Sequence, residues 1–307
     1  MSKKFLNPNS FILLLFIIFI MTSPVDAKKK KKKNDHKIKI LVVDGQSKFH
    51  EHWKEWTPVL LKQLDESKLF QIDVATSPMK GESLDKFNPK FKNYDVVVTT
   101  YDGDTWSMRT KRNLENYVEG GGGLVVVHAA DNAFPNWEGY NLMIGLGGWG
   151  DRNEKAGPYV YLDNNGEIVR DTSPGNGGHH GPKHEYVVET RKAEHPIMKD
   201  IPEKWLHAED ELYDMLRGPA VNMEILATSY SSEKFEGTQR HEPILMTITY
   251  GDGRIFHTVM GHNKLSLSCV GFMTTFIRGC QWAAKKEVTF EVPDDFPLGN
   301  TTSVRTY

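Results

Sequence analysis

The chain has 307 residues, 39% of them hydrophobic, which is long enough to bury an ordinary hydrophobic core. Residues 1–33 hold eight of the 38 Lys and Arg residues and one of the 40 Asp and Glu residues. Residues 34–307 therefore carry 30 basic and 39 acidic residues, a net charge of −9. This balance argues against a nucleic-acid partner, because phosphate binding requires a basic surface.

Residues 1–27 have the pattern of a cleaved signal peptide. Lys3 and Lys4 precede the apolar run 11–21, and Val25 and Ala27 place small residues at positions −3 and −1 of the cleavage site. Eleven apolar residues are far fewer than the roughly 20 that a spanning helix needs. We therefore expect no stable membrane span, and export to the periplasm or the extracellular space.

Six lysines, residues 28–33, follow the predicted cleavage site. We interpret residues 28–36 as a solvated, disordered leader. Weak electrostatic attachment to an anionic membrane or glycan surface is the alternative.

Strands and helices then alternate, which is the order of a doubly wound parallel sheet. Strands are predicted at 37–44, 70–76, 95–100 and 124–127, and helices at 57–66 and 108–118. Thr57 can cap the first helix, and Pro58 suits its first position. Glycines 120–123 allow a tight bend before the last of these strands, whose unbroken apolar run is typical of a strand covered on both faces.

Residues 145–182 contain ten glycines and three prolines and predict a long Gly-rich insertion, either poorly ordered or lining a site. Strands are predicted again at 186–189, 224–229, 243–250 and 254–260, the last two joined by a hairpin turn at 251–253. Residues 37–292 are expected to form a single domain, followed by an extended, exposed tail at 293–307.

Both cysteines, Cys269 and Cys280, fall in a predicted amphipathic helix at 268–284. Eleven residues of helix separate them by roughly 16 Å at 1.5 Å per residue, which is too far for a disulfide. We expect both thiols to be free and buried.

Several groups of polar residues follow predicted strands, and a parallel sheet brings such strand ends together. They are His50 with His52, His128 with Asp131, the segment 179–185 with three histidines, the carboxylates at 209–211, and His262. Each group also has a structural interpretation: a hydrogen-bonded histidine that closes a strand end, a His-rich surface loop, or a solvated acidic face.

The functional interpretation gives these groups three roles. His128, Asp131 and Glu211 are the candidate catalytic residues, with His128 as base, acid or ligand and Asp131 fixing its tautomer. The candidate ligands of a divalent metal such as zinc are His50, His184 and His262. Trp137 and Trp149, with Asp210, are candidate substrate-binding residues, because an indole ring can stack on a pyranose face; core packing is the alternative for both rings.

Four ordered segments, LVVVHAAD, AEHPIMKDIP, AEDELYDM and YGDGRIFHTVMGH, resemble the ThuA-like family of trehalose utilisation proteins. The likeness spans about residues 38–284. It implies a fold similar to class I glutamine amidotransferases, that is, a flavodoxin-like layered α/β sheet with helices on both faces. It also implies a link to sugar metabolism, including keto-sugar derivatives of disaccharides. Ala129 departs from the family pattern, in which a glycine commonly follows the strand-end histidine.

In the amidotransferases that the family resembles, a nucleophilic cysteine occupies the turn after the central strand, and here that turn holds His128. An imidazole cannot form the thioester of glutamine hydrolysis, so we expect no glutaminase activity. The leading hypothesis is an exported enzyme that acts on a sugar or keto-sugar derivative by histidine acid–base or metal-assisted chemistry. The alternatives are a noncatalytic carbohydrate-binding module and an assembly role; no oligomeric state is predicted.

Overall fold

The structure is a computed structural model that describes residues 37–47 and 53–307. The predicted signal peptide, the Lys-rich leader, His50 and His52 lie outside the described residues. Residues 37–307 belong to one compact unit. Within the described ranges, no helix combines the length and hydrophobicity needed to cross a membrane.

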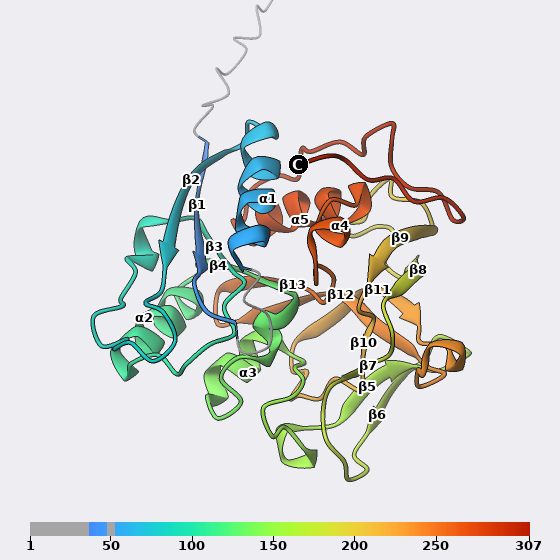
Figure 1. The fold of residues 1–307 in the computed structure, drawn as a ribbon, viewed down its shortest axis with the longest axis horizontal. Coiled ribbons are helices and arrows are strands. Elements are labelled where there is room, and N and C mark those ends of the chain that lie inside the picture. The colour runs from blue at the N-terminus through green and yellow to red at the C-terminus, as the bar shows by residue number, and fades with distance from the viewer. Residues whose placement is uncertain (1–36, 48–52) are drawn as a thin grey trace, which may run out of the picture. The chain divides into compact units, whose positions relative to one another are not determined.

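Five parallel strands form one half of the central sheet (Figure 1). Their order is β2 (Phe70–Thr76), β1 (Ile38–Asp44), β3 (Val96–Thr99), β4 (Gly123–Val127) and β13 (Gly253–Thr258). The first four follow the flavodoxin order 2-1-3-4, and β13 takes the place of the fifth strand. The predicted α/β class with a flavodoxin-like, doubly wound sheet is confirmed. β3 and β4 are buried along their whole length, as their Val-rich sequences predict.

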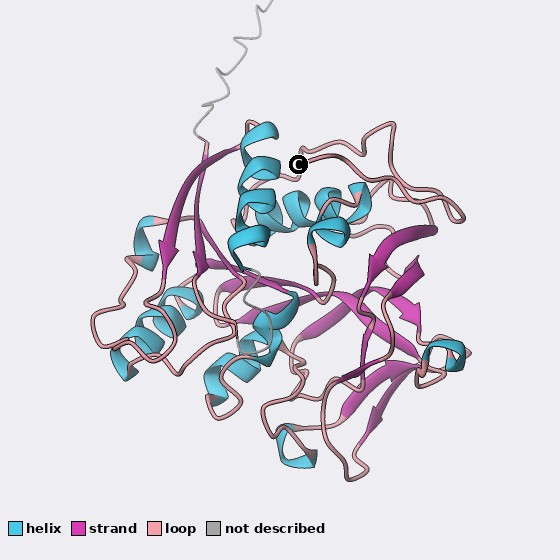
Figure 2. Cartoon of the chain, in the orientation of Figure 1, coloured by secondary structure: helices cyan, strands magenta, loops and turns pink. Residues whose placement is uncertain are grey.

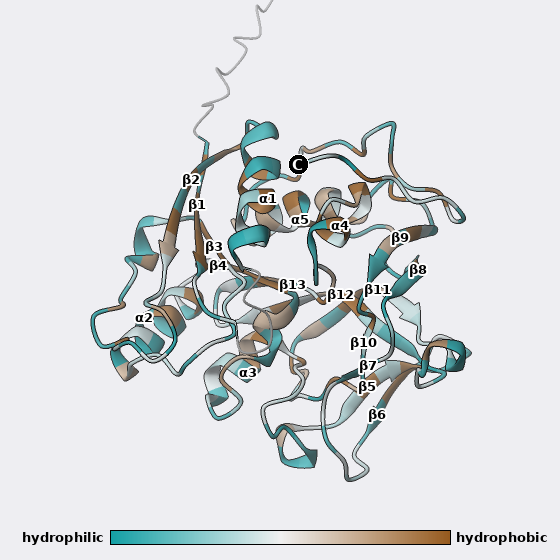
Figure 3. Ribbon diagram, in the orientation of Figure 1, coloured by the Kyte–Doolittle hydropathy of each residue, from teal (hydrophilic) through white to brown (hydrophobic). Residues whose placement is uncertain are grey.

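Helices cover both faces of these strands (Figures 1 and 2). On one face lie α1 (Trp53–Glu66), α4 (Lys264–Leu267) and α5 (Val270–Ala283); on the other lie α2 (Met108–Glu119) and α3 (Glu138–Ile144). Figure 3 shows that hydrophobic residues concentrate in the central strands between these layers. The core of the domain therefore lies between the two helical layers and the sheet.

Helix α1 begins four residues before the predicted start, so Thr57 and Pro58 lie inside it. Thr57 does not cap the helix. Its hydroxyl donates a hydrogen bond of 2.6 Å to Asp44 at the end of β1, and this contact ties the helix to the carboxyl edge of the sheet.

Antiparallel strands extend the sheet beyond β13. They are β12 (His241–Tyr250), β11 (Met223–Tyr230), β8 (His184–Thr190) and β9 (Lys204–Asp210). The turn between β12 and β13 is the predicted hairpin. β9 was not predicted, because its sequence KWLHAED ends in acidic residues that are typical of a surface turn.

The Gly-rich insertion is more regular than its composition predicts. It contains the hairpin of β5 (Tyr159–Leu162) and β6 (Ile168–Asp171), and β7 (His179–His180), which pairs with β10 (Tyr213–Asp214). The fully buried Arg217 donates hydrogen bonds to the carbonyls of Gly157, Ser173 and Gly175. One guanidinium thus satisfies three backbone acceptors of a segment that has few ladder partners of its own.

The C-terminal segment 293–307 is extended, but the expectation that it is exposed is only partly right. Phe296 is buried, and the Val270 N–H donates to the carbonyl of Ser303. The Arg305 N–H donates to Ser268, just before α5. Cys269 and Cys280 are both free and buried, as predicted.

The contact between α5 and β13 requires a glycine. A Cβ at Gly279 would overlap the ring of Phe256. We expect Gly279→Ala to lower the free energy of unfolding by about 1–3 kcal/mol. The energetic cost of overpacking is larger than the roughly 1 kcal/mol that alanine gains over glycine in helix propensity. Urea denaturation measures this change. Gly299→Ala, whose Cβ meets nothing closer than 3.7 Å, is the control and should change it by less than about 0.5 kcal/mol. Equal stability of the two variants would contradict this packing.

Candidate functional site

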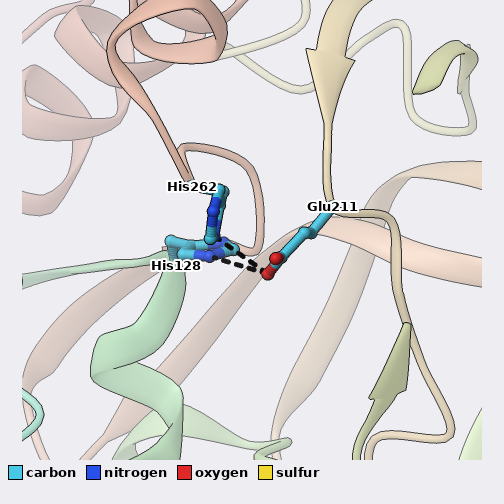
Figure 4. A group of neighbouring side chains, drawn as sticks. All are labelled: His128, Glu211 and His262. Carbon is cyan, nitrogen blue, oxygen red and sulfur yellow. Dashed lines mark ion pairs between the residues drawn. The ribbon is translucent and has the colours of Figure 1, made fainter. Parts of the chain in front are cut away.

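Three buried side chains from separate parts of the sheet converge on one point (Figure 4). His128 follows β4, Glu211 follows β9, and His262 lies in the turn after β13. Their exposed fractions are 1%, 6% and 6%. One ligand atom from each lies within 4.8 Å of the other two, and no second group of this kind occurs among the described residues. The group lies beyond the carboxyl ends of β4 and β13, the edge where open α/β sheets bind ligands.

His128 sits in the sharp turn between β4 and the 3-10 helix η2 (His128–Asn132), with φ of +46°. This conformation is uncommon for a residue with a side chain. Its Nδ1 lies 2.7 Å from the carbonyl oxygen of Val259. A carbonyl only accepts, so Nδ1 carries the proton and Nε2 the lone pair. Burial lowers the pKa of His128, which keeps the ring neutral.

One oxygen of Glu211 is close to three imidazoles. Oε2 lies 2.9 Å from Nδ1 of His262, 3.6 Å from Nε2 of His180 and 3.8 Å from Nε2 of His128. Burial alone raises the pKa of Glu211, but the hydrogen bond with His262 and the proximity of His128 hold it below its usual value. The carboxylate is therefore ionised among imidazoles at neutral pH.

Asp210 was predicted to bind substrate, but the structure buries it completely and uses both of its oxygens. Oδ2 accepts from His207 Nε2 at 3.0 Å and from the Gly261 N–H at 2.8 Å; Oδ1 accepts from the N–H groups of Glu211 and His262, each at 3.0 Å. Asp210 thus joins the end of β9 to the turn after β13. Its function in the structure is to position Glu211 and His262, and it has no exposed oxygen for a substrate.

Asp131 does not orient His128 as predicted. Its carboxylate is fully buried and lies 3.3 Å from Nε2 of His257, which is also fully buried. The tautomer of His128 is instead set by the backbone carbonyl of Val259. The five-residue η2 turn carries Asp131 three residues past His128 and directs it at β13.

The His-rich segment contributes a different histidine from the one predicted. The ring of His184 stacks on Phe235 at 3.7 Å, and its Nδ1 donates to the carbonyl of Pro182, so it does not join the group. His180 reaches Glu211 instead, because the pairing of β7 with β10 sets it opposite Tyr213. Adjacent residues of a strand point to opposite faces, and His179 accordingly contacts Asp214 at 2.7 Å.

The two candidate tryptophans have different surroundings. Trp137 is 8% exposed, and its Nε1 donates to Glu115 of α2, so it belongs to the packing of α2 and α3. Trp149 is half-buried, with its ring centroid 4.6 Å from that of Tyr213 and 5.9 Å from that of His180. Trp149 therefore lies beside two neighbours of the three-residue group, whereas the ring of Trp56 in α1 is near the group itself, with its centroid 6.2 Å from that of His128 and 6.5 Å from that of His262.

The donor set fits a divalent metal such as zinc. Metal–ligand bonds of about 2.0–2.2 Å in tetrahedral geometry place ligand atoms roughly 3.4 Å apart. The distances from Glu211 Oε2 to Nδ1 of His262 and to Nε2 of His128, 2.9 and 3.8 Å, lie on either side of this value. A backbone carbonyl fixes the tautomer of His128, as is usual for a metal-binding imidazole. His180 has the same arrangement, since its Nδ1 donates to Gly181. Three protein ligands are typical of a catalytic site that keeps a position open.

The fold and this site together define an α/β protein of the flavodoxin-like class with a His–Glu–His group at the carboxyl edge of its sheet. The family model ThuA, described as trehalose utilisation, matches residues 39–283, and the chain belongs to this family.

Solved structures agree with this assignment. A ThuA-like protein from Parabacteroides merdae is 44% identical, with a TM-score of 0.83 over 88% of this chain and 98% of that one. A ThuA-like protein from Bacteroides uniformis is 19% identical, with a TM-score of 0.58 over 81% and 92% of the two chains, a likeness of fold. None of the curated proteins compared with the chain matches it.

Asp210→Asn tests the positioning role of this carboxylate. The amide nitrogen cannot accept a hydrogen bond, so buried N–H donors lose their acceptor, and the charge beside His207 is lost. We expect the free energy of unfolding to fall by about 3 kcal/mol, measured by chemical denaturation. Asp252→Asn, in the exposed hairpin turn, is the matched control and should change it by less than about 0.5 kcal/mol. A loss no larger than the control's would refute the positioning role.

Proposed function

We propose that the protein is an exported enzyme of carbohydrate metabolism that acts on a sugar or keto-sugar derivative, with His128, Glu211 and His262 holding a divalent metal ion. The observation that carries this proposal is the convergence of two imidazoles and one carboxylate, all buried, with ligand atoms within 4.8 Å of one another. The sugar class is supported by the family description, trehalose utilisation.

The chemistry follows from the groups present. A divalent ion held there would polarise a carbonyl or hydroxyl oxygen of the substrate. It would also lower the pKa of a bound water molecule to about 7. The neutral ring of His128 offers a lone pair, and ionised Glu211 offsets positive charge. Burial of all three side chains excludes bulk water, which strengthens electrostatic interactions in the site. The half-buried Trp149 offers a flat apolar surface for one face of a pyranose.

The site does not suit glutaminase chemistry. The turn after β4 holds His128, and a glutaminase needs a thiolate that its substrate can reach. Cys269 and Cys280 are both 0% exposed, at the start and in the body of α5. Neither thiol is accessible to a substrate.

Metal content tests the proposal directly. Protein purified without an affinity tag should contain about one zinc or similar divalent ion per chain by elemental analysis. Glu211→Gln and His262→Ala should weaken metal binding by more than about 100-fold, because each removes a direct ligand. His184→Ala is the matched control, a histidine of the same domain that lies outside the group, and should keep the metal.

The same preparations, screened against oxidised and unoxidised disaccharides, should show turnover that a chelator abolishes. Absence of a metal from the native protein would contradict the proposed site. So would a loss of metal binding in His184→Ala as large as that in Glu211→Gln and His262→Ala. Saturable sugar binding without a product would favour the noncatalytic alternative.

Export gives a separate prediction. The exported protein should begin at Lys28, because Val25 and Ala27 fit the cleavage site. Intact-mass analysis of the protein recovered from the periplasm or the medium measures this. Ala27→Phe places a bulky residue at position −1 and should block cleavage, whereas Ala27→Gly should permit it. Recovery of full-length native protein from the cytoplasm alone would contradict the prediction.

A further inference from the structure

Tyr213 lies within hydrogen-bond distance of Nε2 of His128. It lies in β10, two residues after Glu211, and is 2% exposed. Its hydroxyl is 2.9 Å from Nε2 of His128. Because Nδ1 of His128 donates to Val259, Nε2 accepts here, and the Tyr213 hydroxyl is the donor.

The tyrosine ring is held between two other rings. Its centroid lies 4.3 Å from that of His128 and 4.6 Å from that of Trp149. The pairing of Tyr213 with His180 fixes the backbone on which the ring is mounted. These contacts leave the hydroxyl little freedom to move away from Nε2.

The lone pair that accepts from Tyr213 is also the one that His128 would give to a metal ion. A single lone pair cannot serve both partners, so metal binding frees the hydroxyl proton for another acceptor. The ring contacts keep this hydroxyl within about one hydrogen-bond length of the ligand atom. An oxygen atom of a molecule bound at this position could then accept the hydroxyl proton, in competition with the neighbouring side chains of Asn132 and Glu211.

We propose that Tyr213 is the hydrogen-bond donor that orients the reacting oxygen of the ligand, so that the site prefers ligands with an accepting oxygen, such as a carbonyl or a carboxylate, over nitrogen ligands. This inference rests on the proposed metal function of His128, Glu211 and His262. It adds a specificity-determining residue to the site.

The test uses the exported protein, beginning at Lys28, loaded with Co²⁺, whose visible spectrum reports ligand binding without any substrate. Acetate is the oxygen probe, and imidazole is the nitrogen probe, which offers no oxygen to Tyr213. Tyr213→Phe should bind acetate at least about tenfold more weakly than the native protein, as expected for loss of one hydrogen bond to a charged group. Its affinity for imidazole should stay within about twofold of the native value.

Tyr140→Phe is the matched control. Tyr140 is 1% exposed, and its hydroxyl donates to the carbonyl of Ala130, so this variant also loses one buried tyrosine hydroxyl. Its acetate affinity should be native. Equal acetate affinity in Tyr213→Phe and native protein, equal loss in Tyr140→Phe, or no spectral response of the native protein to acetate would overturn the role of Tyr213. Failure of the native protein to bind Co²⁺ would instead overturn the metal proposal itself.

Discussion

The geometry of the site depends on one buried carboxylate, Asp210. It accepts hydrogen bonds from His207, from the backbone of its neighbour Glu211, and from Gly261 and His262 in a turn 51 and 52 residues away. Gly261 has φ of +118°, a conformation that side chains disfavour, so the turn can direct both N–H groups at one side chain. Burial opposes the charge of Asp210, but the bond from His207 lowers its pKa below the usual value. Glu211 and His262 can face each other because their backbones share this acceptor.

The second constraint is the turn that presents His128. β4 is buried along its length and is followed by His128 at φ of +46°, which places an imidazole at the carboxyl edge of the sheet. The Val259 carbonyl then fixes which ring nitrogen carries the proton. Together, the turn and the carbonyl direct one lone pair toward Glu211 and Tyr213. A neutral, oriented imidazole suits ligation or proton transfer, and it cannot carry out thioester chemistry.

Sequence patterns were sufficient for the parts of the fold that depend on local periodicity. The buried runs of β1, β3 and β4 and the helices α2 and α5 were predicted close to their observed bounds, as was the placement of His128 and His262 after strands. The expectation that α5 is amphipathic was wrong, because every residue of this helix except Trp282 is buried. The assignment of carboxylates was harder. Glu209, Asp210 and Glu211 look alike in sequence, yet Glu209 is exposed while the other two are buried, and the hydrogen bonds that hold Asp210 come from a turn more than 50 residues away.

The remaining differences come from long-range pairing. The choice of His180 over His184 depends on two-residue strands that meet across 33 residues of sequence. The same pairing places Tyr213 next to His128 and Trp149. Trp137, in contrast, packs against α2 and donates a hydrogen bond to Glu115. None of these contacts has a local sequence signal, because glycine-rich segments carry little periodicity.

The central claim is that His128, Glu211 and His262 form a metal site. Anomalous diffraction from crystals of the tag-free protein, recorded above and below the absorption edge of the metal found by elemental analysis, tests it most directly. The account predicts one strong peak among the three side chains, about 2.0–2.2 Å from each ligand atom. A peak at any other place on the chain, or none at this group in protein supplied with zinc, would contradict it.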